Sequence, residues 1–192
     1  MPVSGVPEDS PEVFQRAVRE IRALQLRAEV QLEEVPAPRK LAPWALALSA
    51  DVVSRDDEEL ASGRFVLLHD PQGQDGWAGT SRVVTLTRAE LDHEVATDPL
   101  LGRVGWAWLE ESLAGRGVAP AGLSGSVTRV VSESFGTMAD RPATVEVEVR
   151  GSWTPDEDDV AASLQAWTDL LCTAAGLPPL PDGVVPFPRR LP

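Results

Sequence analysis

Apolar residues recur every three or four positions in three parts of the chain, which predicts three amphipathic helices. The first is long, beginning at the N-cap signal Ser10-Pro11-Glu12 and ending before Pro36. The second follows Asp98-Pro99, and its apolar face consists of Leu101, Gly105, Trp108, Leu109 and Leu113. The third follows Thr154-Pro155, and its inward face consists of Val160, Leu164, Trp167, Leu171 and Ala174.

Alternation of apolar and polar residues predicts strands between these helices. Three come in succession, ALALSADVV, GRFVLLHD and GTSRVVTLT, and two more lie in SGSVTRVVSESFG and ATVEVEVRGSW. Asp70 to Gly76 is turn sequence, so the second and third strands form a hairpin, with Trp77 anchoring the third. Thr87 with Glu90 makes a capping-box signal, which predicts a short additional helix after the third strand.

The elements therefore follow the order α-β-β-β-α-β-β-α, in blocks rather than in βαβ units. This order predicts an α+β fold, an antiparallel sheet of about five strands with helices packed on one face. We expect one domain over residues 10–180, preceded by a disordered N-terminus (1–9) and followed by a proline-rich tail (181–192). The succession of elements resembles that of the type III secretion chaperones, which often dimerise, and a homodimer is one expectation from it.

Composition narrows the classes of function. The net charge of −13 argues against binding to nucleic acid or to anionic membranes. No apolar run approaches the ~20 residues of a membrane helix, and no secretory signal is visible, so we expect a cytoplasmic protein. One cysteine, Cys172, excludes an internal disulfide framework. Sixteen arginines against one lysine indicate a GC-rich genome.

His69 and Asp70 are the first candidates for chemistry, because a histidine beside an acid can act as a general base or metal ligand. Zinc requires three or four ligands, and the other histidine, His93, falls in a different predicted element. The turn chemistry of Asp70 and the residues after it favours a structural role. No nucleotide-binding, metal or nucleophile motif is present, so we expect no cofactor, no metal and no catalytic residue.

Trp106 and Trp108 point about 200° apart on a helix, so they cannot both enter one core face. We expect one of them, Trp106, to be partly exposed or buried against a partner, since interfaces favour tryptophan. Arg82, Arg129 and Glu133 belong to the wetter faces of strands. Cross-strand pairing explains these charges, and a polar docking surface is the alternative.

Six blocks of the chain resemble one family: APWALALSADVV, GRFVLLHDPQGQDGWAGTSRVVTL, DPLLGRVGWAWLEESL, SGSVTRVVSESFG, VEVRGSWTP and AWTDLLCTAAGLPP. They are similar to the actinobacterial domain-of-unknown-function family three thousand over roughly Leu41 to Pro179. The resemblance implies an actinobacterial cytoplasmic protein. It implies no catalytic residues, because the family is biochemically uncharacterised.

Two functions follow as hypotheses. The leading one is a non-catalytic, chaperone-like accessory protein that binds another protein through a sheet edge or through the tryptophan-bearing helix. The alternative is an enzyme or small-ligand-binding protein with a pocket that uses His69, Asp70 and Glu133, which requires these side chains to converge.

Overall fold

The computed structural model describes residues 9–91 and 98–179 and contains helices and strands in the predicted blocks. In chain order the elements are α1 (Glu12–Ala23), β1 (Val30–Val35), β2 (Trp44–Val53), β3 (Glu59–His69), β4 (Ser81–Leu91), α3 (Leu101–Gly115), β5 (Ala121–Ser132), the 3-10 helix η1 (Gly136–Met138), β6 (Thr144–Thr154) and α4 (Val160–Ala174). The predicted disordered N-terminus, apart from Asp9, the tail 181–192 and His93 lie outside the described residues.

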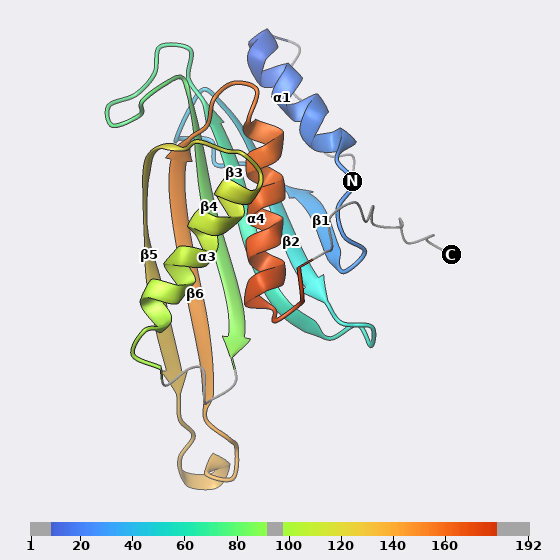
Figure 1. Ribbon diagram of the computed structural model, residues 1–192, viewed down its shortest axis with the longest axis vertical. Coiled ribbons are helices and arrows are strands. Elements are labelled where there is room, and N and C mark those ends of the chain that lie inside the picture. Colours follow the sequence, from blue (N-terminus) through green and yellow to red (C-terminus); the bar gives the residue numbers. More distant parts are fainter. Residues whose placement is uncertain (1–8, 92–97, 180–192) are drawn as a thin grey trace.

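The strands form one antiparallel sheet in the order β1-β2-β3-β4-β6-β5. The helices lie on one face of this sheet, and α4 runs between α1 and α3 (Figure 1). The predicted α+β class and one-sided helix layer are therefore confirmed. The sheet has six strands, one more than we expected. Its opposite face carries no helix among the described elements, and we call it the open face.

The core lies between the sheet and α4, because α4 packs against the sheet below it and against helices on both sides. All five predicted inward residues of α4 are buried, as are the other apolar residues Ala166, Leu170 and Cys172. The indole of Trp167 donates a hydrogen bond to the backbone oxygen of Leu86 at 3.2 Å. Its ring also lies above Gly63, where a Cβ would come within 2.9 Å of Trp167 Cζ2. The absence of a side chain at Gly63 lets α4 approach the sheet closely.

The predicted long N-terminal helix is wrong in its second half. Helix α1 ends at Ala23, and the chain returns as strand β1, which pairs with β2 from Val30↔Val52 to Val35↔Ala47. The helix that we expected up to Pro36 includes Leu32, which fits the helical spacing but also alternates with its neighbours at the strand period. Pairing with β2 satisfies the backbone of this segment and decides between the two periods.

The predicted helix at Thr87 is also wrong. Thr87 and Glu90 both belong to β4, where Thr87 pairs with Val149 and Glu90 with Glu146. The Thr87 side chain is buried on the helix-covered face of the sheet. A capping box requires an exposed helix start, and the buried Thr87 does not provide one. Strand β4 continues through this signal to Leu91 because both of its neighbours, β3 and β6, are long.

The hairpin between β3 and β4 is confirmed. The Asp70 backbone N–H donates to Thr80 at 2.8 Å, and the Gly73 N–H donates to the Asp70 carbonyl at 2.9 Å. Gly73 and Gly76 have φ of +67° and +82°, the left-handed region that a turn of this kind requires. Within residues 9–91 and 98–179, no helix combines the length and the apolar character needed to cross a bilayer.

Candidate interaction surface

Strand β5 is the most exposed of the described strands, because among them it pairs with β6 alone and forms one edge of the sheet (Figure 1). Ten of its twelve residues are exposed, and only Leu123 and Val127 are half-buried. Its sequence, AGLSGSVTRVVS, contains a single charged residue, Arg129. One whole side of its backbone has no strand beside it in the described structure. The outer side of β5 therefore presents backbone donors and acceptors that no described strand pairs, and it is poor in charge.

Exposed apolar side chains cluster where β5 runs into its hairpin with β6. Val130 and Val131 are 45% and 55% exposed at the end of β5, and Phe135 and Met138 are 75% and 48% exposed at the hairpin tip. Glu133 is exposed beside them. Single exposed apolar residues are ordinary, but four in a span of nine residues are a local concentration of exposed apolar side chains at one end of the edge strand. We call β5 and these tip residues the β5 edge.

Arg82 holds the beginning of β5 to the sheet. Its side chain is only 8% exposed, on the open face of β4. The guanidinium donates to Ser152 Oγ at 2.8 Å and Thr154 Oγ1 at 3.3 Å on β6, and to the Gly122 carbonyl at 3.1 Å and Ser124 Oγ at 3.4 Å on β5. Burial lowers the pKa of Arg82, and these acceptors are all uncharged. The residue thus fixes three strands and is not a free docking charge.

Trp106 extends from α3 over β5 at Gly125. A Cβ at Gly125 would lie 2.7 Å from Trp106 Cζ3 and would overlap the backbone oxygen of Arg150. Trp106 and Trp108 are both half-buried, and both pack against the core. Trp106 is partly exposed, as we expected, but Trp108, which we expected on the core-facing side, is half-buried as well. Arg129 is exposed on the β5 edge and donates to the backbone oxygen of Asp98 at 3.4 Å.

His69 and Asp70 make separate structural contacts. The His69 ring is buried beside Phe14, with centroids 6.0 Å apart, and its Nδ1 lies 2.9 Å from Ser81 Oγ. Burial lowers the pKa of His69, which favours the neutral ring. The Asp70 carboxylate accepts hydrogen bonds from the Gln72 N–H at 3.0 Å and from Gln74 Nε2 at 3.2 Å, so it serves the turn.

The residues of the alternative hypothesis do not converge. His69 pairs with Ser81 at one end of the sheet, whereas Glu133 follows Ser132, which pairs with Thr144 at the other end. Trp77 is half-buried in the β3–β4 turn, where its backbone N–H donates to Gln74 at 3.0 Å. The structure gathers Trp106, Arg82 and Arg129 around β5, with Glu133 close after it. It places His69, Asp70 and Trp77 together only as parts of one hairpin.

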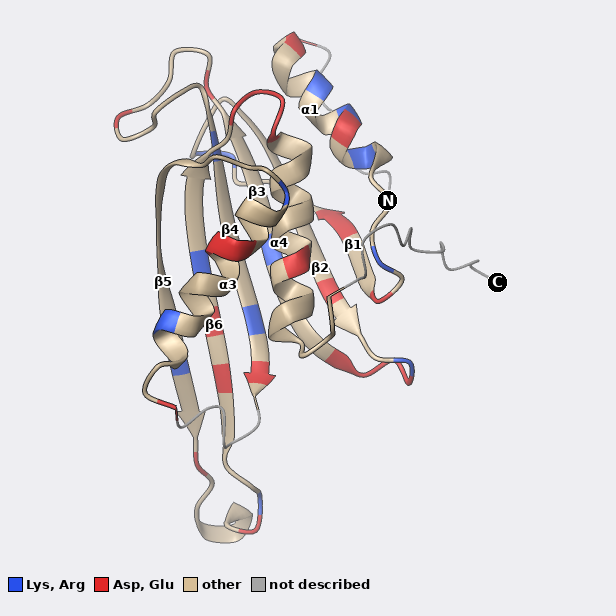
Figure 2. Cartoon of the chain, viewed as in Figure 1, with Lys and Arg blue, Asp and Glu red and all other residues tan. Residues whose placement is uncertain are grey.

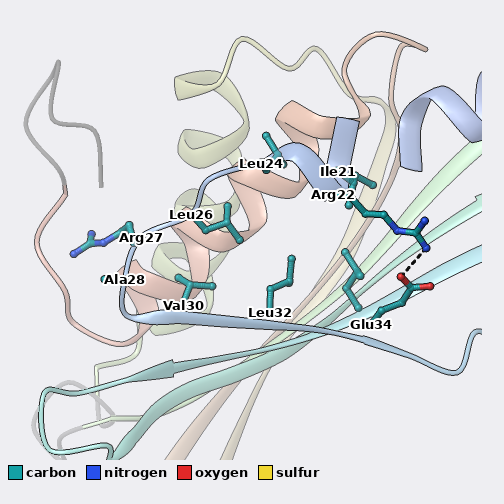
Figure 3. Close-up of a pocket in the computed structure, with 10 residues that line it drawn as sticks. Ile21, Arg22, Leu24, Leu26, Arg27, Ala28, Val30, Leu32 and Glu34 are labelled. Atoms are coloured by element: carbon teal, nitrogen blue, oxygen red, sulfur yellow. Dashed lines mark hydrogen bonds and ion pairs between the residues drawn. The ribbon is translucent and has the colours of Figure 1, made fainter. Parts of the chain in front are cut away.

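A pocket of about 410 Å³ lies between α1, the segment after it and strand β1 (Figure 3). Leu24 and Leu26 line it from the segment after α1, and Val30 and Leu32 line it from β1 (Figure 3). Its charged residues are Arg22, Arg27 and Glu34. Arg22 pairs with Glu34 at 3.0 Å, and Arg27 pairs with Glu29 at 3.2 Å while donating to the Pro178 carbonyl at 2.8 Å. These cations are therefore neutralised within the chain. Sequence reasoning missed this pocket because the pocket depends on β1, where the apolar spacing predicts a helix.

Other titratable groups of the described residues also have structural partners. Glu148, 7% exposed on the open face, accepts hydrogen bonds at 2.7 Å from both Arg88 and Arg150. The bond to Glu148 raises the pKa of Arg88. Burial raises the pKa of the Cys172 thiol to about 11, so the thiolate nucleophile is disfavoured at neutral pH. No group of three or more metal-ligating side chains occurs in residues 9–91 and 98–179.

The class defined by this architecture is an α+β protein with one helix-covered sheet face and a bare, weakly charged strand at one edge. The chain matches the sequence model of the family described as "Protein of unknown function (DUF3000)" over residues 10–185, and it belongs to that family. No curated protein matches it, and no solved structure does. The family assignment agrees with the resemblance found in the sequence blocks.

Proposed function

We propose that this protein is a non-catalytic, chaperone-like accessory protein that binds another polypeptide along the β5 edge. The observation that supports the proposal is the twelve-residue edge strand with one charge and an exposed apolar end. Folded proteins normally protect long, uncharged edge strands, because unpaired backbone groups there recruit other strands. An edge left in this state in a stable fold is suited to strand addition, in which an extended segment of the partner continues the sheet.

The chemical character of the β5 edge indicates which kind of partner segment it binds. Backbone pairing supplies affinity without selecting side chains, whereas Val130, Val131 and Phe135 select an apolar segment. The near-absence of charge gives no preference for a basic partner, although the chain as a whole is acidic. The partner segment is therefore extended, β-prone and largely uncharged.

We place this activity in the cytoplasm of an actinobacterium. Two observations support this placement: a single cysteine held as a buried free thiol, which suits a reducing compartment, and the strong excess of arginine over lysine. The alternative function, a small-ligand site near His69 and Asp70, has less support. Both side chains are engaged in the hairpin, and the pocket of about 410 Å³ is lined by residues of α1, β1 and β2 instead.

Affinity capture from the native host tests the proposal, with the tagged wild-type chain compared with two lysine variants. Val131→Lys places a charge on the edge, and Leu41→Lys places the same charge on an equally exposed residue in the β1–β2 connection. We expect the wild type and Leu41→Lys to retain the same partner and Val131→Lys to lose it. Equal capture by both variants, or none by the wild type, would contradict the proposal.

A further inference from the structure

We infer that the occupant of the β5 edge is the β5 strand of a second copy of this chain, paired antiparallel across a two-fold axis. The inference rests on the proposed function, since it names the polypeptide that the edge binds. Two six-stranded sheets would become one continuous twelve-stranded sheet, and the two helix layers would lie on the same side. Antiparallel pairing of a strand with itself is the arrangement that a closed two-fold dimer requires.

Charge distinguishes this edge from the rest of the acidic molecule. Residues 121–143 contain two basic residues, Arg129 and Arg141, and two acidic ones, Glu133 and Asp140, so their formal charge is zero against −13 for the chain. The upper part of β5 carries no charged residue in Figure 2, whereas acids gather before α4 and on the β2–β3 connection. Two copies that meet along β5 therefore bring neutral surfaces together and keep their acidic clusters apart.

The side chains of β5 fit one register of self-pairing. If Val127 lies on the two-fold axis, Val131 of one copy faces Leu123 of the other, and Val130 faces Ser124. Thr128 then faces Ser126, a hydroxyl pair that is favourable across antiparallel strands. In this register, odd-numbered residues lie opposite odd-numbered ones and even-numbered residues opposite even-numbered ones. The helix-covered faces of the two sheets therefore lie on the same side of the joined sheet.

The same register gives Arg129 and Trp106 a role. Arg129 of one copy lies opposite Gly125 of the other, and Trp106 covers Gly125 from α3. A guanidinium brought to this position lies against the indole ring, where a cation–π contact stabilises the pair. Trp106 is only half-buried in the single chain. The contact occurs twice because the dimer is symmetric.

The size of the seam sets its strength. Twelve residues at about 3.4 Å each make a line of contact between the two β5 strands, the β5 seam, of roughly 40 Å. With a sheet depth of about 10 Å, each copy buries roughly 400 Å² of surface. The total of about 800 Å² from the strands alone falls in the range of weak, reversible complexes. We therefore expect a dimer that dissociates in the micromolar range.

Sedimentation equilibrium of the full chain across micromolar concentrations tests the inference. We expect the average mass to rise from 20.6 kDa towards twice that value. Val131→Lys should raise the dissociation constant at least about tenfold, and Leu41→Lys should leave it unchanged. A wild-type mass that stays at 20.6 kDa, or a dimer that Val131→Lys does not weaken, would overturn the inference.

Cysteine cross-linking tests the register independently of any unfolding by the lysine variant. Directly opposed residues have Cα atoms about 4.5–5.5 Å apart, which a disulfide can span. A mixture of Ser126→Cys and Thr128→Cys chains should cross-link on oxidation, and neither variant alone should do so. Efficient cross-linking of either variant alone would overturn the register, and no cross-link in any sample would overturn the β5 seam.

These results also separate the inference from the proposed function. If the chain remains a monomer but captures a different protein, and Val131→Lys abolishes that capture, the second-copy inference fails and the proposed function stands. If the chain remains a monomer and captures nothing through β5, both fail.

Discussion

The two edges of the sheet are protected to different degrees. Strand β1 has six residues and carries Glu33 and Glu34, with Glu34 paired to Arg22 of α1. Strand β5 has twelve residues and one charge, and its end is apolar. Short length and charge are the means by which proteins keep edge strands from recruiting other chains. The molecule uses both at β1, whereas β5 is long and carries a single charge, which is why we place the binding surface at β5.

The largest effect is expected from removing Arg82, because this side chain fixes β5 to the sheet. Arg82→Ala leaves the Gly122 carbonyl and three hydroxyls without their donor, so the free energy of unfolding should fall by about 2–4 kcal/mol. Denaturant titration measures the loss. Arg64→Ala, an exposed residue on the same open face, is the matched control and should change stability by less than about 0.5 kcal/mol.

Gly125→Ala should have the next largest effect. The added Cβ meets the Arg150 backbone oxygen and the Trp106 ring, and overpacking of this kind costs about 1–3 kcal/mol. The displaced strand should also lose its capacity to dimerise. Gly115→Ala is the control, since a Cβ there meets nothing within 4 Å. Equal stability of the two variants would show that Trp106 does not press on β5.

Removing Glu33, one of the two charges of β1, tests the comparison from the other edge. Gln31→Val with Glu33→Val replaces exposed polar residues with β-branched apolar ones. Strand β1 should then begin to recruit other chains, and light scattering should detect species larger than a dimer. The pair Gln31→Val with Glu33→Lys retains a charge and should remain like the wild type. If both pairs behave as the wild type does, the charge of Glu33 is not what protects β1.

The smallest expected effect is a change of stability with pH that arises at His69, in the β3–β4 hairpin distant from β5. Burial lowers the pKa of His69, whereas Glu157 and Asp70 act in the opposite direction more weakly. The unfolded chain therefore takes up a proton at His69 before the folded chain does, and stability should decline as the pH falls below about 6.5. His69→Gln should remove this part of the decline. A decline of the same size in the variant would assign it to other groups.

The sequence predicted the parts of the fold in which one period dominates. Helix α4 and strand β6 each show an uninterrupted pattern, and Val160, Leu164 and Trp167 are buried as expected. Strand β1 was missed because Leu32 fits both the helical and the strand period, and only pairing with β2 decides between them. The continuation of β4 through Thr87 was missed for the same reason, since a local cap signal cannot show that two long strands flank it.

The candidate surface was only partly predictable. Trp106 could be expected to be partly exposed, because two tryptophans on opposite sides of one helix cannot share a core face. The burial of Arg82 could not, because its acceptors lie 40 to 72 positions away in the chain. The hydroxyl residues Ser124, Ser152 and Thr154 were the available signal, and sheet order was needed to place them beside Arg82. The bare edge itself follows from strand order, which alternation does not determine.

Hydrogen exchange of the wild-type chain at low and high concentration tests the central claim most directly, since it observes the backbone of both edges in one experiment. We predict that amides of β5 between Gly122 and Ser132 become more protected as the concentration rises, while those of β1 do not change. Exchange of β5 that is equally fast at every concentration would contradict the account, and so would protection that grows at β1 instead.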